Sequence, residues 1–206
     1  RPGYELEQVV AHEIAHQYWY GIVASNEAEE AWLDEAFATY AEYRLLQTEY
    51  GLSGNLGLEA ISLKHPAPLK LDAWKFTDHD QYAANVYTRG KLVLLTIERE
   101  IGTSAMRKVL KTYYDRWKFR HPGTDDFRRV LEDVTGRSWQ RFFDQFVYGK
   151  MMLDYEVKDI RSRDVIKNGR RMREYTVTLA SHGGWLKPVP VLFRFADGTV
   201  AEELWQ

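Results

Sequence analysis

The sequence predicts a mainly α-helical chain with a small β-rich end. Up to about residue 150, apolar residues recur at the three- and four-residue spacing of amphipathic helices. Beyond Gly149-Lys150 the apolar period shortens to two, which is typical of half-buried strands. We therefore expect two domains, a helical one over residues 1–150 and a β-strand-rich partial sandwich over residues 151–206.

Seven helices are predicted in the first domain, separated by glycine and proline stops. They cover residues 4–20, 27–50, 56–63, 81–101, 103–118, 124–135 and 138–148. The first helix carries four apolar residues at helical spacing, namely Leu6, Val9, Val10 and Ile14. A loop interrupted by Pro66 and Pro68 lies between the third and fourth helices.

Two of these helices begin at recognisable caps. Asn26 is suited to cap the helix over residues 27–50, and Thr124 or Asp125 to cap the one over residues 124–135. Three carboxylates after Asn26 favour the positive end of the helix dipole, namely Glu27, Glu29 and Glu30. We prefer this structural role for the acidic cluster to a role in cation binding.

Four short strands are predicted in the second domain. The first begins with Tyr155, Val157 and Ile160, and the others cover residues 175–179, 189–195 and 199–205. Asn168-Gly169 is a two-residue hairpin signal, so we interpret the basic run around it as a solvated hairpin tip rather than a binding patch. Four strands form only part of a sandwich, which suggests a fragment of a longer chain.

Composition narrows the possible functions. The net charge is −2 and the basic residues are dispersed, so there is no electrostatic footprint for nucleic acid. The chain has no cysteine, which excludes disulfides and thiolate metal sites but says nothing about compartment. No apolar run approaches the ~20 residues that cross a bilayer.

The most informative stretch of the chain is His12-Glu13-Ile14-Ala15-His16. Histidines at i and i+4 share a helical face with Cβ atoms about 5–6 Å apart, close enough to bind one zinc ion. Glu13 lies on the same turn, where its carboxylate can reach a water at the metal. Glu35 follows His16 after eighteen residues and supplies a third ligand from the next helix.

A His/His/Glu set leaves one coordination position open, which is the catalytic pattern, whereas four-ligand sites are structural. The pentapeptide alone also occurs by chance, and helical histidines are commonly packed or solvated. Glu35 at this spacing is what favours the metal site. Asp34, Thr39 and Glu42 remain open as partners for the ring nitrogens that do not bind metal.

The motif with Glu35 inside Trp-Leu-Asp-Glu-Ala-Phe-Ala resembles the gluzincin metallopeptidases of the membrane alanyl aminopeptidase and leukotriene hydrolase family. The resemblance implies one zinc ion bound by His12, His16 and Glu35, with Glu13 as general base. It also implies the helical half of a thermolysin-like zincin catalytic domain followed by part of a β-sandwich. An extracytoplasmic or membrane-associated parent protein is compatible with this family.

A second element is Val86-Tyr87-Thr88-Arg89-Gly90, which is similar to the family's Tyr-x-Lys-Gly element. The resemblance implies that the Tyr87 hydroxyl stabilises the oxyanion of the tetrahedral intermediate. Tyr82, five residues earlier, is the alternative. Arg89 stands where the family usually has Lys, and Ala36 where it usually has Gly; both changes are compatible with a helix.

One departure bears on activity. The family's Gly-x-Met-Glu-Asn element, which captures the substrate amine upstream of the zinc helix, has no counterpart before His12. The β-rich N-terminal part that carries it is missing too, and we expect this remainder of the parent polypeptide to pack on the chain. The remaining histidines are interpreted as surface or structural: His65, His79, His121 and His182.

The sequence therefore predicts zinc-dependent peptide hydrolysis of the aminopeptidase type, in which Glu13 takes a proton from a zinc-activated water. Peptides are the expected partners, and nucleic acid is not. Two alternatives stay open. One is a non-catalytic zinc-stabilised scaffold or binding module, and the other is a thermolysin-like endopeptidase.

Overall fold

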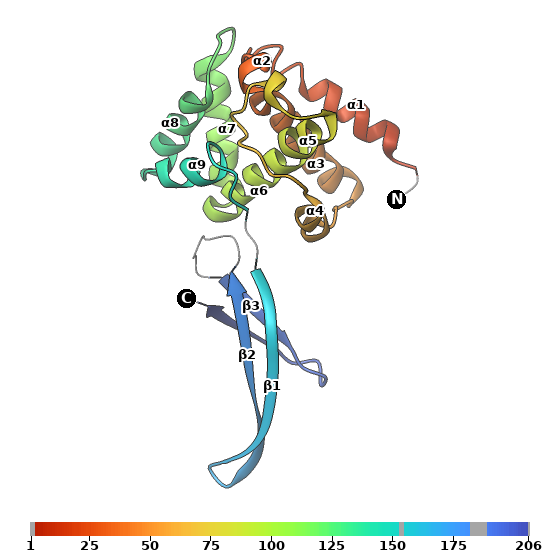
Figure 1. Ribbon diagram of the computed structural model, residues 1–206, viewed down its shortest axis with the longest axis vertical. Coiled ribbons are helices and arrows are strands. Elements are labelled where there is room, and N and C mark those ends of the chain that lie inside the picture. The colour runs from red at the N-terminus through yellow and green to blue at the C-terminus, as the bar shows by residue number, and fades with distance from the viewer. Residues whose placement is uncertain (1–2, 153–154, 182–188, 206) are drawn as a thin grey trace. The chain divides into compact units, whose positions relative to one another are not determined.

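The computed structural model describes residues 3–152, 155–181 and 189–205. By its internal contacts the chain divides into two units, Arg1–Lys150 and Met151–Gln206. The first unit is built of helices and the second carries strands (Figure 1). The prediction of a mainly α chain with a small β end is confirmed.

The first unit is a succession of helices and helical turns. They are α1 (Glu5–Ala15), α2 (Glu27–Glu30), α3 (Trp32–Tyr50), α4 (Leu56–Ser62), the 3₁₀ turn η1 (Ala73–Lys75), α5 (His79–Ala83), the π-helical turn η2 (Ala84–Arg89), α6 (Gly90–Ile101), α7 (Thr103–Trp117), α8 (Thr124–Thr135) and α9 (Gln140–Phe146).

The predicted extension of the first helix to residue 20 is wrong. α1 ends at Ala15, and turns follow in which the Tyr20 N–H donates to the Val23 carbonyl at 3.0 Å. Tyr20 has a φ of 101°, outside the helical region. Val23 forms a bridge to Arg120, nearly a hundred residues later. This long-range pairing overrides the local helical pattern. The periodicity of the sequence cannot reveal a pairing between residues so far apart.

Two of the predicted helices are interrupted in the structure. The one over residues 27–50 is divided at Ala31 into α2 and α3, and the Asn26 side chain caps α2 by accepting from the Ala28 N–H at 3.1 Å. The one over residues 81–101 contains the π-helical turn η2 between α5 and α6. Such turns occur frequently at functional sites.

The start of α8 is held by acidic side chains rather than by the predicted Thr124 or Asp125 cap. Glu30 Oε2 accepts from the Thr124 N–H at 2.5 Å, and the Asp126 carboxylate accepts from the Gly123 N–H at 3.0 Å. Glu30, which the sequence assigned to the dipole of its own helix, thus caps a helix far away in the chain.

The core of the helical unit is a cluster of aromatic side chains around α3. Phe37 and Phe127 meet edge to face with ring centroids 4.9 Å apart, and Tyr113 packs on Phe127 at 5.2 Å. Trp32 is fully buried and donates through its indole nitrogen to the Thr124 hydroxyl at 2.9 Å. This packing fixes the first turns of α3, where Glu35 lies.

The second unit consists of two antiparallel hairpins. β1 (Tyr155–Lys167) pairs with β2 (Arg170–Ser181), and β3 (Val189–Arg194) pairs with β4 (Val200–Trp205). Asn168 and Gly169 both have positive φ, the conformation of the tight turn that the sequence predicts there. β1 starts at Tyr155, where the sequence predicts the first strand to begin, and continues to Lys167. The assignment to a β-sandwich stays a prediction.

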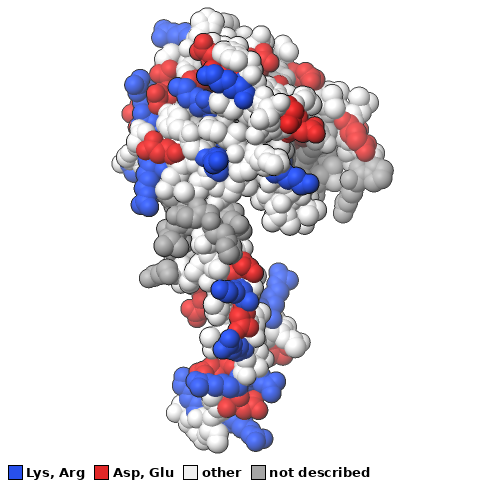
Figure 2. All heavy atoms as spheres, viewed as in Figure 1, with Lys and Arg blue, Asp and Glu red and all other residues white. Residues whose placement is uncertain are grey.

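Positive and negative side chains are interleaved on the face of the molecule seen in Figure 2. On the β1–β2 hairpin, Arg163 pairs with Glu174 at 2.5 Å and Arg173 with Asp164 at 3.1 Å. Among the residues that the structure describes, no helix combines the length and apolar character needed to cross a bilayer.

Candidate metal centre

Two packed helices bring the predicted ligands together. His12 lies on α1, His16 directly follows that helix, and Glu35 is on the first turn of α3. All three side chains are at least half-buried, and each contributes one donor atom to a group in which all atoms lie within 4.8 Å of one another.

The three donor atoms form a nearly regular triangle. His12 Nε2 and His16 Nε2 are 3.0 Å apart, and Glu35 Oε2 lies 3.1 Å from the first and 3.3 Å from the second. Zinc bonds of about 2.0–2.1 Å imply edges of about 3.3–3.4 Å for a tetrahedral donor set. The triangle is therefore close to one face of such a tetrahedron, and the residues fit a zinc ion.

The outer ring nitrogens of both histidines meet carboxylates. His16 Nδ1 lies 2.6 Å from Asp34 Oδ1, and His12 Nδ1 lies 3.2 Å from Glu42 Oε2. Because an ionised carboxylate only accepts hydrogen bonds, each imidazole donates through Nδ1, which leaves the Nε2 lone pairs pointing at each other. Two Nε2 lone pairs repel each other when the nitrogens are 3.0 Å apart unless a proton or a cation lies between them. A metal ion would meet this requirement.

Of the three candidate partners that the sequence left open, Asp34 and Glu42 contact the histidines and Thr39 does not. The Thr39 hydroxyl donates instead to the Glu35 carbonyl at 2.7 Å, within α3. Asp34 and Glu42 are 3% and 7% exposed, so these carboxylates have lost most of their water and depend on the imidazoles as partners.

The pKa values of the cluster show how strongly its members interact. Burial disfavours a charged His12, yet hydrogen bonds to Glu35 and Glu42 outweigh it and raise the pKa of His12 to about 9. Burial would raise the pKa of Glu35, but the hydrogen bonds from His12 and Tyr87 lower it. For Asp34 burial prevails over the nearby His16 and raises the pKa to about 7.

Tyr87 joins this cluster from the π-helical turn η2. Its hydroxyl donates to Glu35 Oε1, and its ring stacks on that of His12 with centroids 5.7 Å apart. Burial, followed by the hydrogen bond to Glu35, raises the pKa of Tyr87. The hydroxyl is therefore a protonated donor beside the donor triangle.

A small residue lets η2 approach α3 this closely. A Cβ built on Gly90 would lie 2.4 Å from the Ala36 Cβ, so any larger side chain at either position would push the two segments apart. Ala36 follows Glu35 directly, and Gly90 lies one turn after Tyr87. The pair thus sets the spacing between Tyr87 and the carboxylate that it contacts.

Tyr82, the alternative to Tyr87, packs against the Tyr87 ring. The Tyr82 ring packs against Tyr87 at 6.1 Å and against Phe76 at 5.4 Å. Burial, then the charges of Glu35, Glu27 and Asp34, raise the pKa of Tyr82 to about 12. Tyr82 is thus a neighbour of the cluster, while Tyr87 is the tyrosine that contacts the candidate ligand Glu35.

Glu13 is more exposed than the two histidines of the motif. It lies on α1 between the two histidines, but its side chain is exposed, whereas theirs turn inward. Exposure leaves its carboxylate accessible to a molecule that approaches α1 from outside.

Sequence reasoning assigned Glu27 only to the helix dipole. A carboxylate oxygen of Glu27 lies within 4.8 Å of oxygens of Asp34 and Glu35, at the edge of the histidine cluster. Among the other histidines, His121 binds the Ala24 carbonyl at 2.8 Å through Nδ1, as expected of a structural residue. His182 lies outside the described residues.

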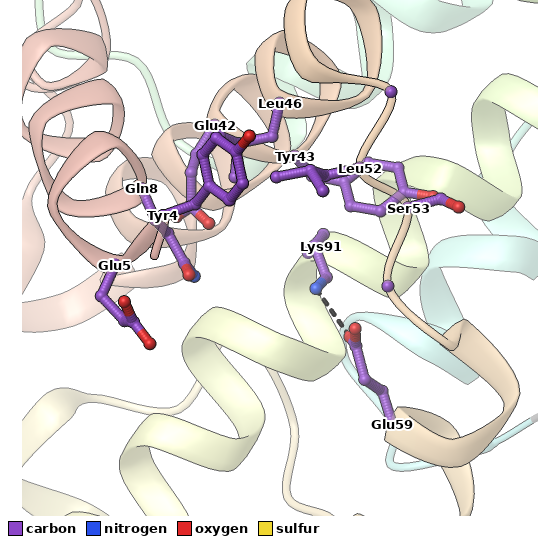
Figure 3. Close-up of a pocket in the computed structure, with 12 residues that line it drawn as sticks. Tyr4, Glu5, Gln8, Glu42, Tyr43, Leu46, Leu52, Ser53, Glu59 and Lys91 are labelled. Carbon is purple, nitrogen blue, oxygen red and sulfur yellow. Dashed lines mark hydrogen bonds and ion pairs between the residues drawn. The ribbon is translucent and has the colours of Figure 1, made fainter. Parts of the chain in front are cut away.

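A cavity of about 390 Å³ adjoins the cluster through Glu42. Figure 3 shows Tyr4, which precedes α1, Gln8 of α1, Tyr43 and Leu46 of α3, and the ion pair between Lys91 and Glu59, whose length is 2.6 Å. Glu42 is the only residue that this cavity shares with the histidine cluster. The cavity and the donor triangle are therefore separate features.

A model of the Peptidase family M1 domain matches residues 3–146. Aminopeptidase M1-A of Oryza sativa is 24% identical over 195 residues, which is 88% of this chain and 21% of that protein. Aminopeptidase N of Lactobacillus helveticus is 29% identical over 140 residues, or 62% of this chain and 16% of that protein. The chain thus spans about a fifth of the length of these relatives.

Solved structures resemble the fold. Aminopeptidase A of Legionella pneumophila, in complex with aspartic acid, aligns with a TM-score of 0.68 over 96% of this chain and 23% of that one, at 18% identity. A mutant M1 zinc metallopeptidase from Deinococcus radiodurans, bound to a Tyr-Ser-Ala substrate, aligns with a TM-score of 0.59 at 25% identity. That alignment covers 72% of this chain and 34% of the other.

Proposed function

This chain belongs to peptidase family M1, and on that premise we propose that it carries the zinc site of an aminopeptidase-type metallopeptidase. The main support is the triangle of His12 Nε2, His16 Nε2 and Glu35 Oε2, with edges of 3.0–3.3 Å. Asp34 and Glu42 orient the two imidazoles, as carboxylates around zinc histidines commonly do.

One zinc ion, when bound, supplies Lewis acidity, which polarises a scissile carbonyl and lowers the pKa of water towards ~7. With the ion bound, the imidazoles of His12 and His16, neutral at Nε2, and the Glu35 carboxylate would hold it. A set of three protein ligands suits catalysis because one coordination position stays available.

Glu13 is proposed as the general base. Its carboxylate takes a proton from the attacking water and later delivers it to the leaving amine. Its exposure on α1 supports this role because the group has to reach a substrate rather than fill the core.

Tyr87 is proposed as the donor to the oxyanion of the tetrahedral intermediate. Its hydroxyl is protonated and donates to Glu35 Oε1, so the donor is already held beside the ligand set. One preorganised donor of this kind is commonly worth about 3–4 kcal/mol of transition-state stabilisation.

Peptides are the proposed substrates, and the remainder of the parent polypeptide is the proposed partner of α1. Four large apolar residues of this helix are 47–72% exposed: Leu6, Val9, Val10 and Ile14. An amphipathic helix normally buries such a stripe, so this face is suited to packing against further protein.

The test is metal analysis of the purified chain together with hydrolysis of a fluorogenic aminoacyl substrate. We expect about one zinc per chain, loss of hydrolysis with a chelator and recovery with added zinc. Absence of bound zinc, or hydrolysis that a chelator leaves unchanged, would refute the proposal. Stoichiometric zinc without hydrolysis would favour the scaffold, and cleavage of N-terminally blocked peptides the endopeptidase.

A further inference from the structure

The π-helical turn η2 carries two buried polar side chains that point away from the candidate metal centre. Asn85 and Arg89 are each 1% exposed, four residues apart on this turn. Residues two apart on a helix lie on nearly opposite sides, so Tyr87, which stands between them in sequence, faces the other way. Whatever fixes Asn85 and Arg89 therefore also sets the direction of Tyr87.

Arg89 binds backbone carbonyls of two other segments of the described chain. Its Nη1 donates to the Ala67 carbonyl at 3.0 Å, and its Nη2 donates to the carbonyls of Phe146 at 2.7 Å and Gly149 at 3.2 Å. One side chain thus ties η2 both to the loop before η1 and to the end of α9. The planar guanidinium suits this task because its donors keep a fixed geometry.

Asn85 binds the same loop from the other end of the turn. Its Oδ1 accepts from the Ala67 N–H at 2.8 Å, while its Nδ2 donates to the carbonyls of His65 at 3.3 Å and Gln81 at 2.8 Å. Ala67 is therefore held at both its N–H and its carbonyl by two side chains of one π-helical turn.

Burying the charged Arg89 guanidinium costs desolvation free energy. Burial lowers the pKa of Arg89 to about 10, which reports the loss of water around the guanidinium. A well-packed apolar side chain would avoid that penalty. A buried cation that fastens one short turn indicates that the geometry of this turn matters.

We infer that Arg89, with Asn85, is a positioning residue: the clamp on Ala67 and on the end of α9 holds η2 so that the Tyr87 hydroxyl stays against Glu35. The catalytic consequence rests on the proposed function, whereas the structural claim does not. The carbonyls that Arg89 binds lie outside the donor triangle, so its effect on Tyr87 is transmitted through the turn.

The kinetic test is a double-mutant cycle between Arg89→Met and Tyr87→Phe in the chain with zinc bound. A misplaced catalytic group costs up to about 10²-fold, so Arg89→Met should lower kcat by about that factor with little change in KM. Combined with Tyr87→Phe, it should add little. Full additivity of the two losses would overturn the inference. Arg89→Lys keeps a cation and should recover most of the turnover.

A second readout does not depend on hydrolysis. With fluorotyrosine incorporated, the ¹⁹F resonance assigned to Tyr87 should shift and broaden in Arg89→Met and in Asn85→Ala, while circular dichroism stays helical. The matched control is Arg137→Met, whose guanidinium stacks on Trp139 at 4.3 Å at the surface. An unchanged Tyr87 resonance in folded Arg89→Met protein would overturn the inference, whereas Arg89→Lys should keep the resonance close to that of the unmodified chain. A shifted resonance in a chain without peptidase activity would contradict only the proposed function.

Discussion

Two regions of this molecule place charged residues in opposite surroundings, one buried and one exposed to water. In the histidine cluster between α1 and α3, the side chains of Asp34, Glu42 and Glu35 are 5%, 9% and 11% exposed. On the β1–β2 hairpin, Arg163 and Glu174 pair at 2.5 Å with side chains that are 74% and 46% exposed. The contacts within the cluster and the ion pair on the hairpin have similar distances, but water screens only the ion pair on the hairpin.

The comparison shows why distance alone does not rank these contacts. In the cluster, each buried group has lost its water and relies on a particular neighbour, so removal of one member leaves another without a partner. On the hairpin, water replaces a lost partner. We therefore expect large consequences from changes in the cluster and small ones on the hairpin.

The largest effect is expected from His16→Ala. The change removes one of three ligand atoms and leaves Asp34 without its 2.6 Å contact, so zinc binding and hydrolysis should both be lost. Elemental analysis after dialysis measures the metal content. His121→Ala, at a histidine that binds the Ala24 carbonyl outside the cluster, is the matched control and should keep the metal. Full zinc occupancy in His16→Ala would contradict the ligand set.

Glu13→Gln separates chemistry from metal binding. Because Glu13 is exposed and outside the donor triangle, the variant should keep zinc and its folded structure. Loss of a general base typically lowers turnover by about 10²–10⁴-fold. Steady-state kinetics with an aminoacyl substrate measures this, with Glu7→Gln on the same helix as control. Unchanged kcat in the zinc-loaded variant would remove Glu13 as the base.

Asp34→Asn and Glu42→Gln test the carboxylates behind the histidines. Loss of such a partner commonly lowers metal affinity by about 10–100-fold. The effect should be larger for Asp34, whose contact is 2.6 Å, than for Glu42 at 3.2 Å. Competition with a chromophoric chelator gives both affinities. Glu49→Gln, on the exposed end of α3, should match the unmodified chain. Equal affinities in all variants would show that these carboxylates do not support the ligands.

The smallest effect is expected on the hairpin. Arg163→Ala removes the pair with Glu174, and exposed pairs of this kind contribute at most about 1 kcal/mol. Hydrogen exchange of the β1 and β2 amides should therefore change little. The small difference should shrink further with added salt. Collapse of protection along both strands would mean that exposed charges matter here as much as buried ones.

Local spacing made the grouping of the three candidate ligands predictable. The separation of His12 and His16 by four residues acts within a single helical turn, and Glu35 carries its own recognisable surroundings on the next helix. The helical character of residues 1–150 follows equally from local periodicity. The predicted end of α1 failed because the bridge between Val23 and Arg120 depends on residues far apart in the chain.

The sequence by itself determined the class of the fold, the three candidate ligands and Glu13, because each depends on residue types at fixed local spacing. Only the tertiary structure decided that Asp34 and Glu42, rather than Thr39, contact the histidines. It also decided that Tyr87, rather than Tyr82, contacts Glu35. The physical reason is that these contacts are set by how closely separate helices approach, as Gly90 approaches Ala36, and such distances are not encoded in the period of any one helix.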